Sequence, residues 1–389
     1  MTISRNSGFG ARLRLLAIGG LASFAIVSSA SAMDLTLATG VAPGSVGVGY
    51  EAFKTYLEEN GDFKTTTYGI ELFDLKQTAP AVRDGSVDVG HVSMPLFPAE
   101  FSETNLVGDL TLLANIGEAP VSIGALIGAA MTEYVLLNCK DCWQQNLRQN
   151  QVYLGTGTGT QWGLLCTKPI RNADDIKGTN FKATAGVFRR WVEHFGGTGM
   201  AINPAETFEA LSQGIIDCTV NAIPEMSNYS LFGAVKTIND TVPGGTYGGV
   251  ALTNVNLDVW RSLSVEQRQV FLGAAARAAA AISVDYYRIQ TRDLEQAKAQ
   301  GIIIDAADES LVKATIGFIE QDVPNTMKIY TDTYKLGNVE QKVEIFRGLV
   351  EKWKKLTNEI DPLDVDALAG LYNQEIYSKL DVANYPEAR

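Results

Sequence analysis

Two stretches of the chain share one pattern, in which a helix ends at a glycine and an aspartate precedes a strand. AVRDGSVDVGHVS contains Gly85 and Asp88, and ALSQGIIDCTVNA, 129 residues later, contains Gly214 and Asp217 at matching places. Glycine ends helices readily because it adopts positive φ angles without steric cost. Two such units in one chain predict two lobes that are wound alike, with chance reuse of a favourable turn as the alternative.

Strand and helix patterns alternate around the first unit. MDLTLATG and KTTTYGI have the alternation or the β-branched content of strands, YEAFKTYLEENG and LKQTAPAVRDG have helical spacing, and VAPGSVGVG is typical of a loop. SVDVGHVS completes a βαβαβ order, which indicates a mainly parallel sheet covered by helices. In the second unit, we expect Asn203 to be a helix N-cap, with Pro204 in the first turn and Glu206 completing a capping box.

The last third of the chain has helical patterns. A segment that begins at Ser264 has a capping box with Gln267 and predicts a helix of more than about 30 residues. Because that length exceeds the usual helix of a single domain, we expect this helix to connect two lobes. VEIFRGLVEKWKKLTNEI and ALAGLYNQEIYSKL predict further amphipathic helices.

The N-terminal residues have the pattern of a secretory signal peptide. Three arginines precede the mostly apolar segment 15–27, and ASA at 30–32 has the small-x-small pattern of a signal-peptidase site. We expect residues 1–32 to be removed, so that Met33 begins a periplasmic protein; an uncleaved membrane anchor is the alternative. The formal net charge is −12, or −15 without the leader arginines. So acidic a chain repels phosphate, and we expect no nucleic-acid partner.

The four cysteines are compatible with export, since disulfides form outside the cytoplasm. Cys139 and Cys142 form a C-x-x-C motif with no second pair or histidine cluster nearby, which disfavours a zinc site. A local structural disulfide, free thiols and a redox dithiol stay open. Whether Cys166 reaches Cys218 cannot be decided from the sequence.

Motifs for catalysis are scarce in this chain. The two histidines, His91 in a predicted strand and His194 in a predicted helix, are interpreted as structural. GTGTGTQWG at 155–163 lacks the Lys-Ser/Thr ending of a P-loop and is interpreted as a hinge that enters a strand. We expect no cofactor and no metal, and we favour solute binding over a secreted enzyme with two lobes.

Ligands of open α/β sheets bind at the carboxyl ends of strands. Lys182 ends the predicted strand TNFK, Asn221 ends IIDCTVN, and Trp162 lies where the Gly/Thr-rich segment crosses. Each has an ordinary structural interpretation by itself, but together they predict a cation, an amide and an aromatic wall for a small organic anion. The expected ligand-binding set also contains three residues from other parts of the chain: Ser45, Ser93 and Tyr247.

The chain resembles the extracytoplasmic solute-binding proteins of tripartite ATP-independent periplasmic (TRAP) transporters, the DctP-type family. The resemblance lies in the segments LTLATGVAPGS, DLKQTAPAVRDGSVDVGHVS, KPIRNADDIKGTNFKATAG, PAETFEALSQGIIDCTVNAIPE and VNLDVWRSLSVEQRQVF. It implies an α/β, two-lobed periplasmic binding protein fold, type II-like, with crossing strands and a long helix between the lobes. It further implies a receptor without a cofactor that closes on a small organic acid and delivers it to the permease subunits of a TRAP transporter.

The predicted lobes are each built from two stretches of the chain. We assign residues 33–155 and about 248–285 to lobe I, and 156–247 and about 286–389, with its helical C-terminal part, to lobe II. We expect a monomer. A ligand sensor for a signalling receptor is the alternative function that the sequence does not separate from transport.

Three positions depart from the family pattern. Members typically have an arginine where Lys182 stands, some have a second at Trp162, and many have a glycine at Cys218. Lysine provides a point charge, whereas arginine provides a planar fork that binds a carboxylate with two hydrogen bonds. A monocarboxylate, a sulfonate, or a hydroxylated or zwitterionic acid is therefore at least as plausible a ligand as a C4-dicarboxylate.

Overall fold

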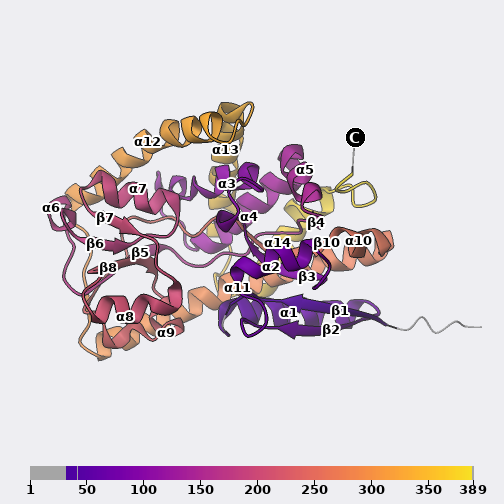
Figure 1. Ribbon diagram of the computed structural model, residues 1–389, viewed down its shortest axis with the longest axis horizontal. Helices are drawn as coiled ribbons and strands as arrows, with labels where there is room; N and C mark the ends of the chain where they lie inside the picture. Colours follow the sequence, from indigo (N-terminus) through magenta and orange to yellow (C-terminus); the bar gives the residue numbers. More distant parts are fainter. Residues whose placement is uncertain (1–31, 42, 388–389) are drawn as a thin grey trace, which may run out of the picture. The chain divides into compact units, whose positions relative to one another are not determined.

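A computed structural model of the protein describes residues 32–41 and 43–387, which form two β-sheets surrounded by helices (Figure 1). The predicted signal peptide lies outside the described residues, apart from Ala32. Within the described ranges, no helix is both long and apolar enough to cross a membrane.

The first sheet has five strands and is mixed. β1 pairs in parallel with β2 and β3, while β10 is antiparallel to β3 and to β4. In spatial order, the strands are β2 (Phe63–Tyr68), β1 (Met33–Ala38), β3 (Val89–Ser93), β10 (Val250–Asn256) and β4 (Gln151–Val152).

The second sheet has six strands and is also mixed. β6 pairs in parallel with β7 and β8, β5 is antiparallel to β8 and β9, and β11 is parallel to β9. In spatial order, the strands are β11 (Ile303–Ile304), β9 (Thr237–Asn239), β5 (Trp162–Cys166), β8 (Cys218–Ala222), β6 (Asn180–Lys182) and β7 (Thr198–Met200).

The helices cover these sheets and make up most of the last third of the chain. Their bounds are α1 (Ser45–Asn60), α2 (Leu75–Arg83), α3 (Ser102–Gly108), α4 (Ile123–Glu133), α5 (Lys140–Arg148), α6 (Ala173–Ile176), α7 (Gly186–His194), α8 (Thr207–Ser212), α9 (Glu225–Asn228), α10 (Leu257–Ser262), α11 (Val265–Ala299), α12 (Glu309–Asp332), α13 (Val339–Asn358) and α14 (Val365–Glu375).

The two sheets repeat one arrangement of four strands. In the first, β1 lies between the parallel strands β2 and β3, with β10 antiparallel beside β3; in the second, β6 lies between β7 and β8, with β5 antiparallel beside β8. Gly85 and Gly214 end α2 and the α8 turn with φ of +73° and +68°. Asp88 and Asp217 each accept a hydrogen bond from a backbone amide of the neighbouring strand. The predicted internal repeat is therefore present in the structure.

Two irregular segments, 153–161 and 240–249, connect the sheets. They contact each other where the Thr158 hydroxyl donates to the Tyr247 carbonyl at 2.9 Å. The Gly/Thr-rich segment enters strand β5, as predicted, and the expected crossing of the chain between two sheets is confirmed.

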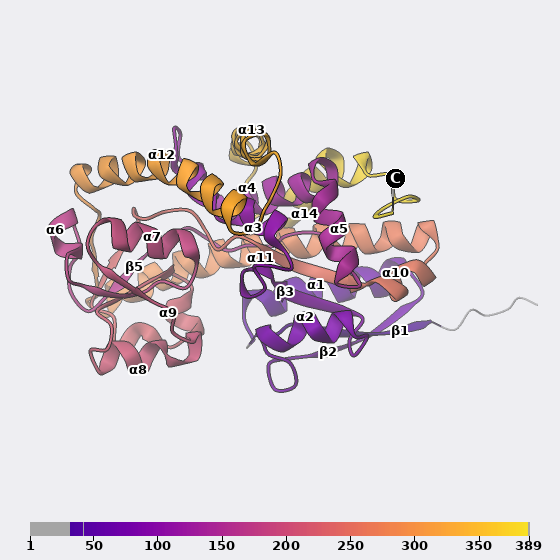
Figure 2. The same ribbon diagram turned by 45° about the horizontal axis from the view of Figure 1, so that its top comes forward.

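The long helix α11 contains 35 residues and extends from the first sheet to the second, as the two views in Figures 1 and 2 show. Its predicted capping box is confirmed, since the Ser264 hydroxyl accepts from the Gln267 amide at 3.2 Å and the Gln267 side chain accepts in return at 3.0 Å. Phe271 near its start packs in the core of the first sheet, and Ala297 near its end packs in the core of the second. The expected connection between two lobes is confirmed by this packing.

Two local predictions were wrong. Helix α1 begins at Ser45, inside the segment that we expected to be a loop, because only Gly40 to Gly44 interrupt the pattern. Asn203 does cap a helical turn, but its side chain accepts from the Ala205 amide, and the turn Pro204–Glu206 is a 3-10 helix. Glu206 does not complete a capping box, because in this tight turn its amide already donates to the Asn203 carbonyl at 2.9 Å.

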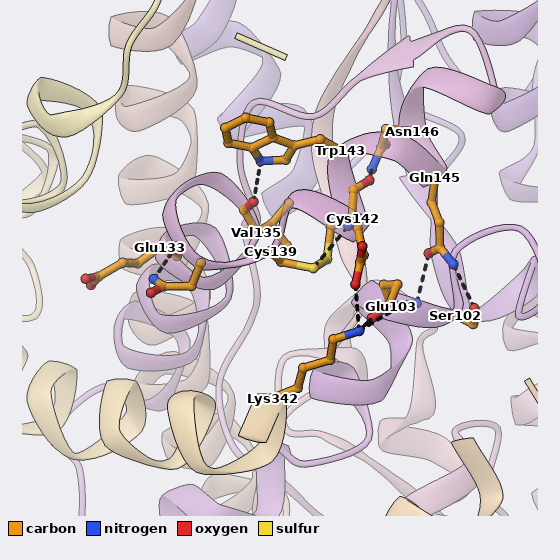
Figure 3. The surroundings of a disulfide bond; sticks show 12 residues. Ser102, Glu103, Glu133, Val135, Cys139, Cys142, Trp143, Gln145, Asn146 and Lys342 are labelled. Carbon is orange, nitrogen blue, oxygen red and sulfur yellow. Dashed lines mark hydrogen bonds and ion pairs between the residues drawn. A yellow bond between two sulfur atoms is a disulfide. The ribbon is translucent and has the colours of Figure 1, made fainter. Parts of the chain in front are cut away.

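Helices α13 and α14 pack on helices that surround the first sheet, whereas α12 packs against α7 beside the second sheet, where the Trp191 indole donates to the Thr315 hydroxyl at 3.1 Å. The Tyr372 hydroxyl of α14 donates to the Ala125 carbonyl of α4 at 2.8 Å. Lys342 of α13 forms ion pairs with Glu103 at 2.7 Å and with Asp141 at 2.9 Å (Figure 3). The placement of the C-terminal part in lobe II, like the other lobe boundaries, stays a prediction.

Both pairs of cysteines form disulfides. Cys139 and Cys142 are joined at the start of α5, where the Cys142 amide also donates to the Cys139 sulfur at 3.1 Å (Figure 3). Both residues are buried, which favours the structural interpretation of this motif over a redox dithiol. Cys166 and Cys218 face each other in the β5–β8 pairing and form the second disulfide.

Candidate ligand-binding site

Lys182 and Asn221 lie on one face of the second sheet. Lys182 is the last residue of β6 and pairs with Thr219 of the parallel strand β8. Side chains two residues apart on a strand point to the same face, so Thr219 and Asn221 share a face with Lys182. The predicted cation and amide are therefore brought together by strand register.

The Lys182 side chain is buried, with 3% of the residue exposed. Within the described residues, its ammonium has no hydrogen bond or ion pair, and Nζ lies 5.8 Å from the centroid of the Tyr229 ring. Burial lowers the pKa of Lys182 to about 8, against the opposing effect of the carboxyl of Glu225. A buried cation without a bonded counter-ion is rare, because desolvation of a charge is costly.

Glu225 is a charged neighbour that the sequence analysis missed. It begins α9, three residues after β8 ends, and 8% of it is exposed. The Asn228 amide donates to its carboxyl at 3.2 Å. Burial raises the pKa of Glu225 to about 7, while the Asn228 hydrogen bond, Lys182 and Tyr286 act in the opposite direction. An acidic residue within the mostly apolar run AIPEM, directly after a predicted strand, is the sequence signal that could have identified it.

The predicted aromatic residue belongs to a different group. The Trp162 ring stacks between Phe188, at 4.7 Å between centroids, and Tyr247, at 5.6 Å. The Tyr247 hydroxyl lies 3.2 Å from the Ser93 hydroxyl. Trp162 pairs with Ala222, the residue after Asn221, so register places Trp162 and Lys182 on opposite faces of the sheet. The six predicted residues thus do not form one cluster around Lys182.

Ser45 lies after strand β1 of the first sheet and close to helix α9. It is the first residue of α1, and its buried hydroxyl has no hydrogen-bond partner in the described residues. The preceding Gly44 approaches α9 so closely that an added Cβ would lie 3.3 Å from Asn228 Oδ1. A residue from each half of the repeat therefore borders the site of Lys182 and Glu225.

Other buried polar atoms near these strands also lack a protein partner within the described residues. The Thr219 hydroxyl, beside Lys182, is one, and Nε2 of His91 in β3 is another. His91 keeps one hydrogen bond, between Nδ1 and the Thr39 carbonyl at 3.0 Å, and burial lowers its pKa to about 4. Buried polar atoms are usually hydrogen-bonded, so each of these atoms has room for a partner such as a water molecule or a polar ligand.

Two other kinds of site are a metal centre and a hollow elsewhere on the molecule. In residues 32–41 and 43–387, no group of three or more His, Cys, Asp or Glu side chains is placed to hold a metal ion. A hollow of about 350 Å³ lies between α7 and α12 and contains none of the six predicted residues. Its cation, Arg190, is already bound by Asp322 at 2.7 Å, so the hollow does not present an unpaired charge.

The fold contains two related sheets, and the buried Lys182 and Glu225 form no ion pair in the described residues. Together these features indicate a protein that binds a ligand. The chain belongs to family 7 of the bacterial extracellular solute-binding proteins, the DctP family, whose model matches residues 42–317. The resemblance predicted from the sequence is confirmed. No curated protein matches the chain by sequence.

Solved structures of TRAP solute-binding proteins share this fold. A Bordetella pertussis receptor that binds pyroglutamic acid has a TM-score of 0.66 at 16% identity, covering 82% of this chain and 100% of the receptor. A marine metagenome protein with metahydroxyphenylacetate has a TM-score of 0.67 at 19% identity, covering 82% and 99%. The ectoine-binding protein of Halomonas elongata has a TM-score of 0.64 at 16% identity, also covering 82% and 99%. These proteins show that the two-lobed fold was predicted correctly.

Proposed function

We propose that the protein is the solute receptor of a TRAP transporter and captures a small organic anion beside Lys182. The observation that carries the proposal is a buried ammonium at the carboxyl end of strand β6, without a bonded protein anion in the described residues. Ligands of α/β sheets bind at such strand ends. Membership of a solute-binding family and the organic acids named for structurally similar proteins support the same class of ligand.

The ligand is a carboxylate or a sulfonate. A lysine ammonium binds either group as a point charge, because it does not require the matched pair of oxygens that an arginine fork prefers. Asn221 and Ser45 are proposed to contribute to the same site, while a contact of the ligand with the separate group of Trp162, Ser93 and Tyr247 stays a prediction. The protein binds the acid without converting it, and it works in the periplasm as a monomer that hands the ligand to the membrane permease.

Thermal-shift measurements with a panel of acids test the proposal. The panel contains pyroglutamate, 3-hydroxyphenylacetate, succinate and ethanesulfonate, and native mass spectrometry of the purified protein shows any acid that co-purifies. A ligand at 100 times its dissociation constant stabilises a protein by about 2.7 kcal/mol, which is a shift of several degrees. If no acid raises the Tm and no small anion co-purifies, the proposed function is wrong.

Two further measurements address location and turnover. N-terminal sequencing of the secreted protein should give Met33 as the first residue, and an intact leader would contradict periplasmic release. An acid incubated with the protein should be recovered unchanged, whereas a new product would support the enzyme alternative.

A further inference from the structure

We propose that Glu225 is a specificity-determining residue, whose carboxyl accepts a hydrogen bond from a donor group on the same organic anion that Lys182 binds. The donor is a hydroxyl, a ring N–H or an ammonium. The inference rests on the proposed function and narrows it, because it excludes simple acids that carry no donor besides their anionic group.

Glu225 differs from the other buried acidic residues of the described structure. Four of them have a basic partner: Glu103 binds Lys342 at 2.7 Å, Glu133 binds Lys352 at 2.8 Å, Asp293 binds Arg292 at 2.8 Å and Asp322 binds Arg190 at 2.7 Å. Glu225 has no such ion pair within the described residues. Buried carboxyls are normally paired or fully hydrogen-bonded, so this exception requires an explanation.

The carboxyl of Glu225 has acceptor positions to spare. A carboxylate offers about four acceptor positions, and the Asn228 amide occupies one of them at 3.2 Å. The side chain of Tyr286 of α11 also acts on this carboxyl as a hydrogen-bonding group and lowers its pKa, which leaves about two acceptor positions. A ligand donor would therefore find an acceptor that is already held in place by its neighbours.

Lys182 and Glu225 are close enough to influence each other without forming an ion pair. The charge of each opposes the effect of burial on the other's pKa, yet the two groups are not bound at ion-pair distance. Two buried and opposite charges that do not bind each other are costly in an empty site. They complement a molecule that carries a negative group and a donor at separate positions.

Calorimetry with matched pairs of acids tests the role of Glu225. In each pair, one acid carries a donor that the other lacks: pyroglutamate and cyclopentanecarboxylate, 3-hydroxyphenylacetate and phenylacetate, 4-aminobutyrate and butyrate. The wild-type protein should bind the donor-bearing acid of at least one pair about 10- to 100-fold more tightly, as expected for a hydrogen bond to a charged acceptor. The three pairs distinguish ring N–H, hydroxyl and ammonium donors.

Substitution of Glu225 should remove this preference. Glu225→Leu should bind the preferred acid about 10- to 100-fold more weakly and its donor-free partner at least as tightly as before, because the variant removes a negative charge near Lys182. The matched control is Glu209→Leu, which removes an exposed carboxyl of α8 in the same half of the molecule and should leave all affinities unchanged. Glu225→Gln, which keeps a neutral acceptor, should weaken an ammonium-bearing acid more than a hydroxyl-bearing one.

The outcomes separate this inference from the proposed function. If the wild-type protein binds acids but does not distinguish the members of any pair, or if Glu225→Leu keeps the preference, the inference is overturned and the proposed function stands. If no acid binds, the proposed function fails and the inference fails with it. Should Glu225→Leu not fold, the wild-type comparison of the three pairs decides.

Discussion

At the scale of single residues, the surroundings of a lysine decide what its charge can do. Lys354 is buried like Lys182, but its ammonium donates to the Ile116 carbonyl at 2.6 Å and lies 3.7 Å from the Glu351 carboxylate. That charge is compensated within the protein. In the described structure, no such hydrogen bond or ion pair compensates the charge of Lys182. An anion that binds beside it therefore stabilises the charged form of the lysine.

Removal of the Lys182 ammonium should weaken ligand binding. A hydrogen bond to a charged group contributes about 1.5–3 kcal/mol, so Lys182→Ala should raise the Kd of the best acid of the panel by about 10- to 150-fold. Calorimetry measures this change, with Lys177→Ala as the control because Lys177 is exposed and lies in the same segment. Equal binding by Lys182→Ala and wild type, with the fold intact, would show that Lys182 is not the anion contact.

The affinity should also depend on pH, because burial lowers the pKa of Lys182 to about 8. An anion binds the protonated form and raises that pKa, so affinity is greatest below about pH 8 and falls as the pH rises, by up to about tenfold per unit. Lys182→Arg should abolish this alkaline decrease, since an arginine stays charged. Titrations between pH 8 and 10, above the pKa of about 7 of the neighbouring Glu225, should show the difference between the two proteins. Identical profiles in this range would contradict the assignment.

At the scale of elements, strand β5 needs a glycine at its second residue. An added Cβ on Gly163 would lie 2.3 Å from the Asn239 carbonyl oxygen of the neighbouring strand β9. This oxygen belongs to the backbone and cannot rotate away as a side-chain atom can. One of the two strands would therefore have to shift. Because β5 continues the segment that crosses between the sheets, such a shift would also reach Trp162.

Gly163→Ala should therefore lower the free energy of unfolding by about 1–3 kcal/mol, as overpacking of a core does. The control is Gly348→Ala in helix α13, where an added Cβ meets nothing within 4 Å, and which should raise stability by about 0.5–1 kcal/mol. Urea unfolding measures both changes. An equal free energy of unfolding for Gly163→Ala and wild type would mean that strand β9 can shift at this position without loss of stability.

At the scale of the whole molecule, the candidate site draws on parts of the chain far apart in sequence. Ser45 begins the helix that follows the first strand of the first sheet, while Lys182 ends a strand of the second sheet and Glu225 begins helix α9, just after another strand of that sheet. In residues 32–41 and 43–387, the segments 153–161 and 240–249 and helix α11 lead from one sheet to the other. A ligand that contacts both groups of residues would favour an arrangement in which they are close together.

Ligand binding should therefore reduce the radius of gyration. Small-angle scattering of the wild-type protein, with and without a saturating acid from the panel, measures the change. The Lys182→Ala variant at the same ligand concentration is the control, since it should bind too weakly to respond. A wild-type profile that is unchanged at saturation would count against a receptor that closes on its ligand.

The sequence by itself determined the features that depend on neighbours along the chain. The capping box of Ser264, the positive-φ glycines at the ends of two helices and the aspartates that follow them are short patterns whose chemistry is complete within a few residues. Their repetition predicted two similarly wound sheets, and the strand end at Lys182 predicted a position for a cation. The resemblance to a known family predicted how these parts are connected into one fold.

Only the tertiary structure decided which distant residues meet. The register of β5 and β8 separates Trp162 from Lys182, because a shift of one residue along a strand moves a side chain to the other face. The pairing of Cys166 with Cys218 follows from the same register. Glu225 becomes a candidate site residue because it is buried without a basic partner in the described structure, which neither its type nor its spacing in the sequence could indicate. These properties depend on solvent exclusion and on long-range packing, which no local pattern of residues contains.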